Sequence, residues 1–95
     1  MKVSWSKRFA QHLRLEYEFL RSSEPANAAL VRDRLIQAAA SLAQFPDRGR
    51  AWRLAGSREL VVPGLPYVLI YRVKEDEVLI ISLFHTSRNW PQKTN

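Results

Sequence analysis

The chain has 95 residues, and 15 Lys and Arg against 9 Asp and Glu give it a formal net charge of +6 and an isoelectric point near 10.3. This length is too short for two independent hydrophobic cores, and the absence of cysteine excludes a disulfide framework and a thiolate metal site. A hydrophobic fraction of 46% argues against disorder in spite of the charge, so we expect one small basic domain over residues 1–95.

The N-terminal half carries a strand pattern and then two helical patterns. Val3 and Trp5 alternate with polar neighbours, which predicts a short edge strand with one buried face. Apolar residues then recur at spacings of three and four, which predicts an amphipathic helix over residues 7–23. A proline in a first turn and a long apolar stripe predict a second helix over residues 25–44.

The C-terminal half has the pattern of a sheet, because the periodicity changes to two and β-branched residues replace helix formers. Strands are predicted at 58–62, 66–73 and 78–84, and 51–54 is compatible with a short additional strand. The order β-α-α-β-β-β predicts an α+β fold in which a helical hairpin packs on a mostly antiparallel sheet.

Arginines gather at the start of the sheet half. Arg48, Arg50, Arg53 and Arg58 lie within eleven residues that contain no acid, and Trp52 lies among them. Guanidinium groups bind phosphates and carboxylates and stack on bases, so the stretch suits nucleic acid or an acidic protein partner. Solvated loop charges are the alternative interpretation.

A second polar cluster, which includes His85, Arg88 and Trp90, follows directly on the last apolar strand. A rigid strand end often carries binding or catalytic side chains, and an imidazole can transfer protons near neutral pH. A hydrogen-bonded structural role for His85 is the alternative. His12, on the first predicted helix, is expected at the surface.

Other chemistries lack the residues that they need. The three glycines match neither a phosphate-binding loop nor a dinucleotide fingerprint, and two histidines without cysteine form no recognisable ligand set. Neither a cofactor nor a metal is therefore expected. Glu16 and Glu18 cannot share a helix face at a spacing of two, and we expect them, like the acids of the hairpin at 75–77, to be solvated charges.

No segment approaches the roughly 18 uninterrupted apolar residues of a membrane span, and the first eight residues lack the apolar run of a signal peptide. The absence of cysteine is consistent with a reducing compartment. A cytoplasmic protein that does not contact a membrane is therefore expected.

The segments GSRELVV (56–62) and LPYVLIYRV (65–73), the charged hairpin, the apolar strand and HTSR (85–88) together resemble the RelE/ParE superfamily of type II toxin–antitoxin toxins. The first strand and the helical hairpin also fit, so the resemblance covers nearly the whole chain. It implies one toxin domain over 1–95 that arrests bacterial growth, with a role in plasmid stabilisation.

Two activities are known in this superfamily. ParE-like members inhibit DNA gyrase, whereas RelE-like members are endoribonucleases that cleave mRNA on the ribosome. The resemblance places Val68 where RelE-like enzymes carry an arginine, and Trp90, near the C-terminus, has no acidic proton to donate. Gyrase inhibition is therefore favoured, and the ribosome-dependent mRNA nuclease is the alternative.

The resemblance also implies site residues and partners. We expect target binding by Arg50, Arg53, Arg58, His85, Arg88 and Trp90; in a nuclease, Arg50, Arg58, His85 and Arg88 would carry the phosphate and proton chemistry.

A ParD-like antitoxin with a flexible, acidic C-terminal segment is the expected partner in a toxin–antitoxin hetero-oligomer. The positive charge of the toxin would speed this association. We expect the antitoxin in the groove between the helical hairpin and the sheet. Because the antitoxin makes the operator contacts in such systems, we assign no sequence-specific DNA binding to this chain.

Overall fold

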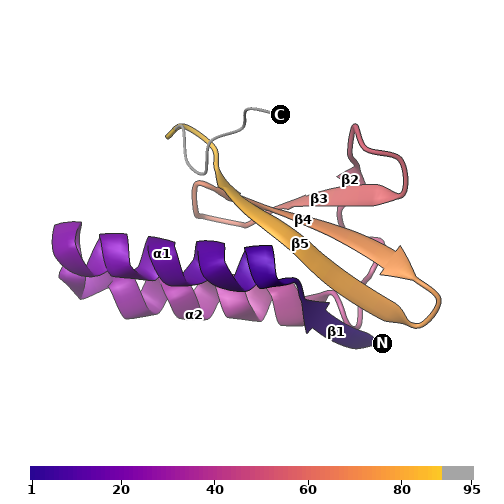
Figure 1. The fold of residues 1–95 in the computed structure, drawn as a ribbon, viewed down its shortest axis with the longest axis horizontal. Coiled ribbons are helices and arrows are strands. Elements are labelled where there is room, and N and C mark those ends of the chain that lie inside the picture. The colour runs from indigo at the N-terminus through magenta and orange to yellow at the C-terminus, as the bar shows by residue number, and fades with distance from the viewer. Residues whose placement is uncertain (89–95) are drawn as a thin grey trace.

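Two helices lie against one face of a five-stranded sheet (Figure 1). The computed structural model of the chain describes residues 1–88. The elements are β1 (Lys2–Trp5), α1 (Lys7–Ser23), α2 (Pro25–Ser41), β2 (Arg50–Ala51), β3 (Ser57–Val61), β4 (Tyr67–Lys74) and β5 (Glu77–His85). The predicted α+β fold is confirmed.

The strands lie in the order β1-β5-β4-β3-β2. β1 runs parallel to β5, and every other neighbouring pair is antiparallel, so the predictions of an edge position for the first strand and of a mostly antiparallel sheet are confirmed. A register shift between Ile70 and Tyr71 inserts an extra residue, Ile81, into β5. Because of this insertion, Ile80 and Leu83 both face the helices although they are three residues apart.

The ends of both helices follow from local hydrogen bonds. The Ser6 hydroxyl accepts from the Phe9 amide at 3.0 Å and donates to the Ile81 carbonyl at 2.8 Å, so one side chain starts α1 and joins it to the sheet. The helix predicted to reach residue 44 ends at Ser41, because the next three amides bond carbonyls three residues back, which tightens the last turn.

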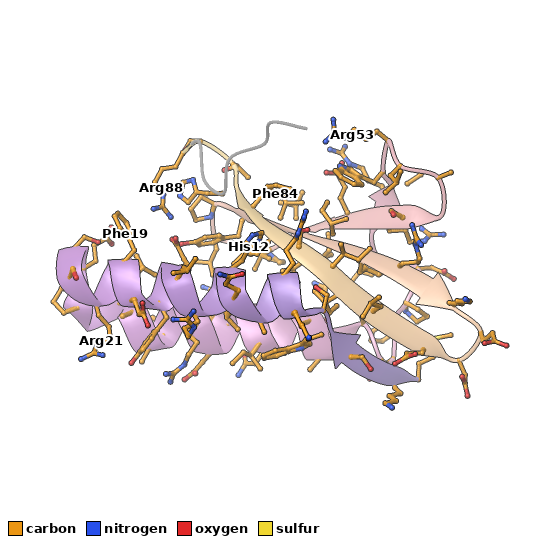
Figure 2. All side chains as sticks on the ribbon, in the orientation of Figure 1. His12, Phe19, Arg21, Arg53, Phe84 and Arg88 are labelled. Atoms are coloured by element: carbon orange, nitrogen blue, oxygen red, sulfur yellow. The ribbon has the colours of Figure 1, made fainter. Side chains whose placement is uncertain are left out.

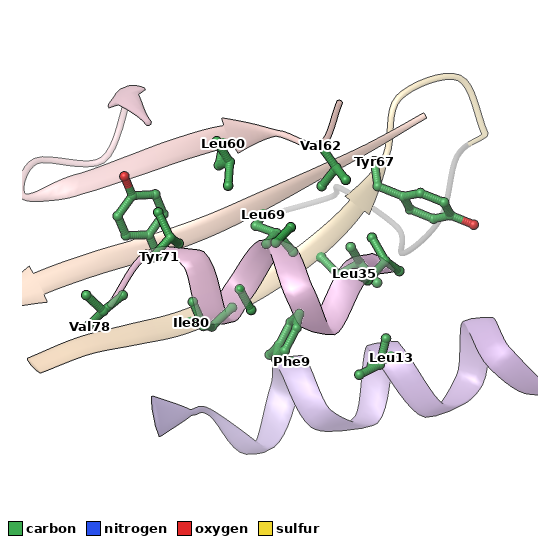
Figure 3. Close-up of a cluster of buried hydrophobic side chains, with 14 residues drawn as sticks. Phe9, Leu13, Leu35, Leu60, Val62, Tyr67, Leu69, Tyr71, Val78 and Ile80 are labelled. Atoms are coloured by element: carbon green, nitrogen blue, oxygen red, sulfur yellow. The ribbon is translucent and has the colours of Figure 1, made fainter. Parts of the chain in front are cut away.

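The core lies between the hairpin and the sheet. Phe9 and Leu13 of α1 and Leu35 of α2 point toward the strands, and all three are buried (Figure 3). The sheet contributes every second residue of its central strands, as the pleat requires. These sheet residues are Leu60, Val62, Tyr67, Leu69, Tyr71, Val78, Ile80 and Leu83.

The strand suggested at 51–54 is wrong in its bounds, because β2 covers Arg50–Ala51 alone. The Ser57 amide bonds the Leu54 carbonyl at 3.0 Å, and Gly56 has a φ of +81°, so residues 52–56 turn back as a loop. This loop carries Trp52 and Arg53 out of the sheet.

A buried tyrosine holds the connection between α2 and β2. The Tyr71 hydroxyl accepts from the Gly49 amide at 2.8 Å and donates to the Pro46 carbonyl at 2.7 Å. A Cβ at Gly49 would lie 2.6 Å from the Glu59 carbonyl and 2.7 Å from the Tyr71 ring, so glycine is the residue that fits.

The Tyr71→Phe variant is expected to lower the free energy of unfolding by about 1–3 kcal/mol, because it leaves the buried Gly49 amide and the partly buried Pro46 carbonyl without this partner. The matched control is Tyr17→Phe, since in the described residues the Tyr17 hydroxyl makes no hydrogen bond. Urea unfolding of the three proteins measures both effects. Equal losses in the two variants would contradict this role of Tyr71.

Candidate functional site

A buried carboxylate, Glu16, lies where α1 meets the end of the sheet. Its side chain accepts hydrogen bonds from the Tyr67 hydroxyl and from the Arg88 guanidinium. Glu16 is 1% exposed, so the prediction of a solvated charge is wrong. The reason is its spacing of three from Leu13 and four from Leu20, which places it on the buried face of the helix, where Arg88 supplies the opposite charge.

Arg88 joins the end of β5 to the outer part of α1. Besides pairing with Glu16, it lies over the Phe19 ring with Cζ 4.5 Å from the centroid, and Figure 2 shows the two side chains pointing toward one another.

Burial and the hydrogen bond to Glu16 raise the pKa of the Tyr67 phenol above its usual value. Tyr67 therefore stays protonated and acts as a hydrogen-bond donor.

His85 closes β5 and shapes the turn that follows. Its Nδ1 accepts from the backbone amides of Ser87 at 3.1 Å and Arg88 at 2.8 Å, and its ring stacks edge-on against Tyr67. Burial and the positive charge of Arg88 lower the pKa of His85, opposed by Glu16. Because Nδ1 accepts these two amides, a neutral ring carries its hydrogen on Nε2, where it can donate a hydrogen bond.

A groove of about 480 Å³ lies between the hairpin and this end of the sheet. We call it the hairpin groove. Its walls include Phe19 and Leu30, which are 48% and 58% exposed, and its polar end is Arg88 with Glu16. The groove therefore offers apolar surface beside a cation that a neighbouring side chain already orients.

A second pocket, of about 360 Å³, lies on the face of the sheet away from the helices. Its floor is apolar and consists of Val68, Ile70 and Phe84. Trp52 and Arg53 of the loop form one side, and His85 and Thr86 lie on its rim. We call it the open-face pocket; Figure 2 shows Phe84 and Arg53 on this side of the sheet.

The predicted arginines have different environments. Arg50 pairs with Glu59 at 2.7 Å, and Arg58 donates to the Gly49 carbonyl at 2.7 Å. Arg53 lies over the Trp52 ring at 4.8 Å, and in the described part of the chain it has no carboxylate partner. Arg58 thus supports the loop before β2, whereas Arg53 presents its charge at the open-face pocket.

The structure does not bring all the predicted site residues together. Along β4, Arg58 lies opposite Tyr71 and His85 lies opposite Tyr67, which separates them by about 13 Å at 3.3 Å per residue. It does bring Arg53 and His85 to one pocket, and His85 and Arg88 to the hairpin groove. Trp90 lies outside the described residues.

His12 is half-buried on α1 rather than at the surface, so that prediction is wrong. Burial is the main cause that lowers the pKa of His12, and the nearby Arg8 adds to it, while a hydrogen bond with the backbone of Leu83 opposes both. Figure 2 shows His12 on the side of α1 that faces the sheet. Contact with β5 explains the burial.

In residues 1–88, His, Asp and Glu side chains form no group of three that could hold a metal ion. The same residues contain no helix that is long and apolar enough to cross a membrane.

A helical hairpin packed on one face of a mixed five-stranded sheet is the fold of ParE and RelE toxins. Residues 3–90 match the model of the ParE toxin family of the type II toxin–antitoxin system parDE, and the chain belongs to this family.

Two relatives support this assignment. A putative toxin, Y4kP, of Sinorhizobium fredii is 33% identical over 96% of this chain and 94% of that protein. A protein described as Toxin RelE2, of Caulobacter vibrioides, is 37% identical over 92% of this chain and 97% of its own length.

Solved structures share the fold. A chain of the chromosomal ParDE toxin–antitoxin system from P. aeruginosa superposes with a TM-score of 0.82 at 21% identity, over 92% of this chain and 97% of that one. The isolated E. coli RelE toxin gives a TM-score of 0.62 at 18% identity, over 92% of this chain and 85% of that one.

The free energy of unfolding is expected to decrease as the pH falls from about 7.5 to about 5.5. The folded chain holds His85 and His12 neutral by lowering their pKa values, so the unfolded chain binds more protons below the usual histidine pKa. His85→Asn, whose amide oxygen can accept the same two amides, should reduce this dependence. Thermal unfolding of both proteins between about pH 5.5 and about pH 7.5 measures the pH dependence of stability. An equal pH dependence in the variant would contradict a contribution from His85.

Proposed function

We propose that the chain is a toxin that arrests growth by inhibiting DNA gyrase, and that it acts by binding this protein rather than by cleaving RNA. The observation that carries the proposal is the apolar floor of the open-face pocket. Val68, Ile70 and Phe84 occupy the positions at which a ligand in this pocket would rest.

RNA cleavage through the 2′-hydroxyl needs a group that accepts a proton and cations that stabilise the charge of the phosphorane. None of the three floor residues can do either. At the rim, His85 uses Nδ1 to accept two backbone amides, and Glu59 is paired with Arg50. Among residues 1–88, Arg53 is the cation of the pocket without a carboxylate partner, and the carboxylate of the pocket, Glu59, is held by Arg50, which supports binding over catalysis.

An antitoxin is the partner that the family implies, and the P. aeruginosa ParDE and E. coli RelBE structures are described as toxin–antitoxin systems. We place the antitoxin segment in the hairpin groove. Phe19 and Leu30 would cover apolar side chains of that segment, and Arg88 would attract its carboxylates. The net charge of +6 favours an acidic segment.

Leu30→Ser is expected to weaken binding of the cognate antitoxin by about tenfold or more, because it removes an apolar contact in the groove. Growth arrest by the variant should remain. Leu54→Ser is the matched control, since Leu54 is 53% exposed on the loop before β3 and Leu30 is 58% exposed. Calorimetric titration measures both affinities, and a larger loss for Leu54→Ser would contradict the placement.

The function is tested by adding the purified chain to two reactions: supercoiling of relaxed plasmid by gyrase, and translation of a defined mRNA by purified ribosomes. We expect loss of supercoiling with accumulation of cleaved plasmid, and intact mRNA. His85→Asn should inhibit gyrase as the unmodified chain does. Cleaved mRNA together with normal gyrase activity would contradict the proposal and support the alternative nuclease.

A further inference from the structure

Three apolar side chains form a row across neighbouring strands on the face of the sheet away from the helices. Val61 of β3 pairs with Val68 of β4, which pairs with Phe84 of β5. Their sequence neighbours Leu60, Leu69 and Leu83 belong to the core, so alternation places all three members of the row on the opposite face. We call Val61, Val68 and Phe84 the apolar row.

This row is unusual for the uncovered face of an antiparallel sheet, which is ordinarily polar. Val61 is 52% exposed, and no helix or strand among residues 1–88 packs over the row. Adjacent apolar side chains at the surface mark a contact site for another molecule. The row continues into the open-face pocket, since Val68 and Phe84 also form its floor.

Positive charge surrounds the row. Arg53 lies at the rim of the pocket, and Arg72 is exposed on β4 two positions beyond Ile70. Arg50, at the neighbouring edge, pairs with the acid on this face, Glu59, so this pair adds no net charge and the positive charge near the row comes from Arg53 and Arg72. An apolar centre with a cationic rim is complementary to an acidic segment of a protein that carries apolar anchor residues.

We propose that the apolar row is the surface with which the chain docks its protein target, through an acidic segment whose apolar side chains pack on Val61, Val68 and Phe84. The inference rests on the proposed gyrase function and names the surface that performs it. A nucleic acid fits less well, because its phosphates need cations and, of the three side chains of the row, Phe84 alone offers a ring on which a base could stack. The centre has no cation, and Arg53 already covers the Trp52 ring.

Two substitutions at one position separate the two kinds of partner. Val61→Glu and Val61→Lys both place a charge in the apolar row, so both should raise the concentration of the chain needed for half-inhibition of gyrase supercoiling about tenfold or more. A nucleic-acid surface would respond in opposite directions, losing affinity with Glu and gaining it with Lys. Phe84→Ala repeats the test by truncation, without adding a charge.

Leu15→Ser is the control, because Leu15 is an exposed apolar residue of α1 that lines neither the hairpin groove nor the open-face pocket. It should inhibit gyrase normally, and thermal unfolding must show that all variants are folded. Growth arrest on expression is a second readout, and it can be measured whichever molecule is the target. If the unmodified chain leaves gyrase active while both Val61 variants abolish growth arrest, the gyrase function is wrong and the docking surface stands. Val61 variants that are fully active in both readouts, or a gain of toxicity with Lys alone, would overturn the surface.

Discussion

The two helices bury one face of the sheet and leave the other face to solvent, and the possible functions of the chain depend on this one-sided packing. Every second residue of β3, β4 and β5 is required by the core beneath the hairpin. The alternate residues point to the opposite face and are not needed for the core. If that face contacted only water, its side chains would be expected to be polar. Val61, Val68 and Phe84 are apolar instead, which is why we assign this face to a protein partner.

The two surfaces meet at His85, which lies on the rim of the open-face pocket and also in the wall of the hairpin groove. Its imidazole accepts hydrogen bonds from the backbone amides of Ser87 and Arg88. These bonds fix the turn after β5, from which the Arg88 side chain reaches the buried Glu16 carboxylate. Glu16 and Arg88 are each costly to bury alone, so the pair holds the end of β5 against α1. His85 thus holds the turn that joins the open-face pocket to the hairpin groove.

The sequence predicted the type and order of the elements, because period and capping residues are local signals, but it did not predict the end of α2 or the bounds of β2. It did not predict the environment of a side chain whose partner is distant in the chain. Glu16 reads as a solvated charge until Arg88, 72 residues later, is brought beside it. The spacing of Glu16 from Leu13 and Leu20 was the signal in the sequence that could have predicted its burial. Arg50 and Arg58 belong to the same arginine-rich stretch, yet Arg50 pairs with Glu59 whereas Arg58 donates to the Gly49 carbonyl, and no local pattern predicted this difference.

Photo-cross-linking tests the central claim most directly. A benzoyl-phenylalanine in place of Val61, on the apolar row, is compared with one in place of Leu30, in the hairpin groove, each irradiated with purified gyrase. The account predicts a covalent toxin–gyrase adduct from position 61 and none from position 30. No adduct from position 61, or an adduct from position 30 alone, would contradict it.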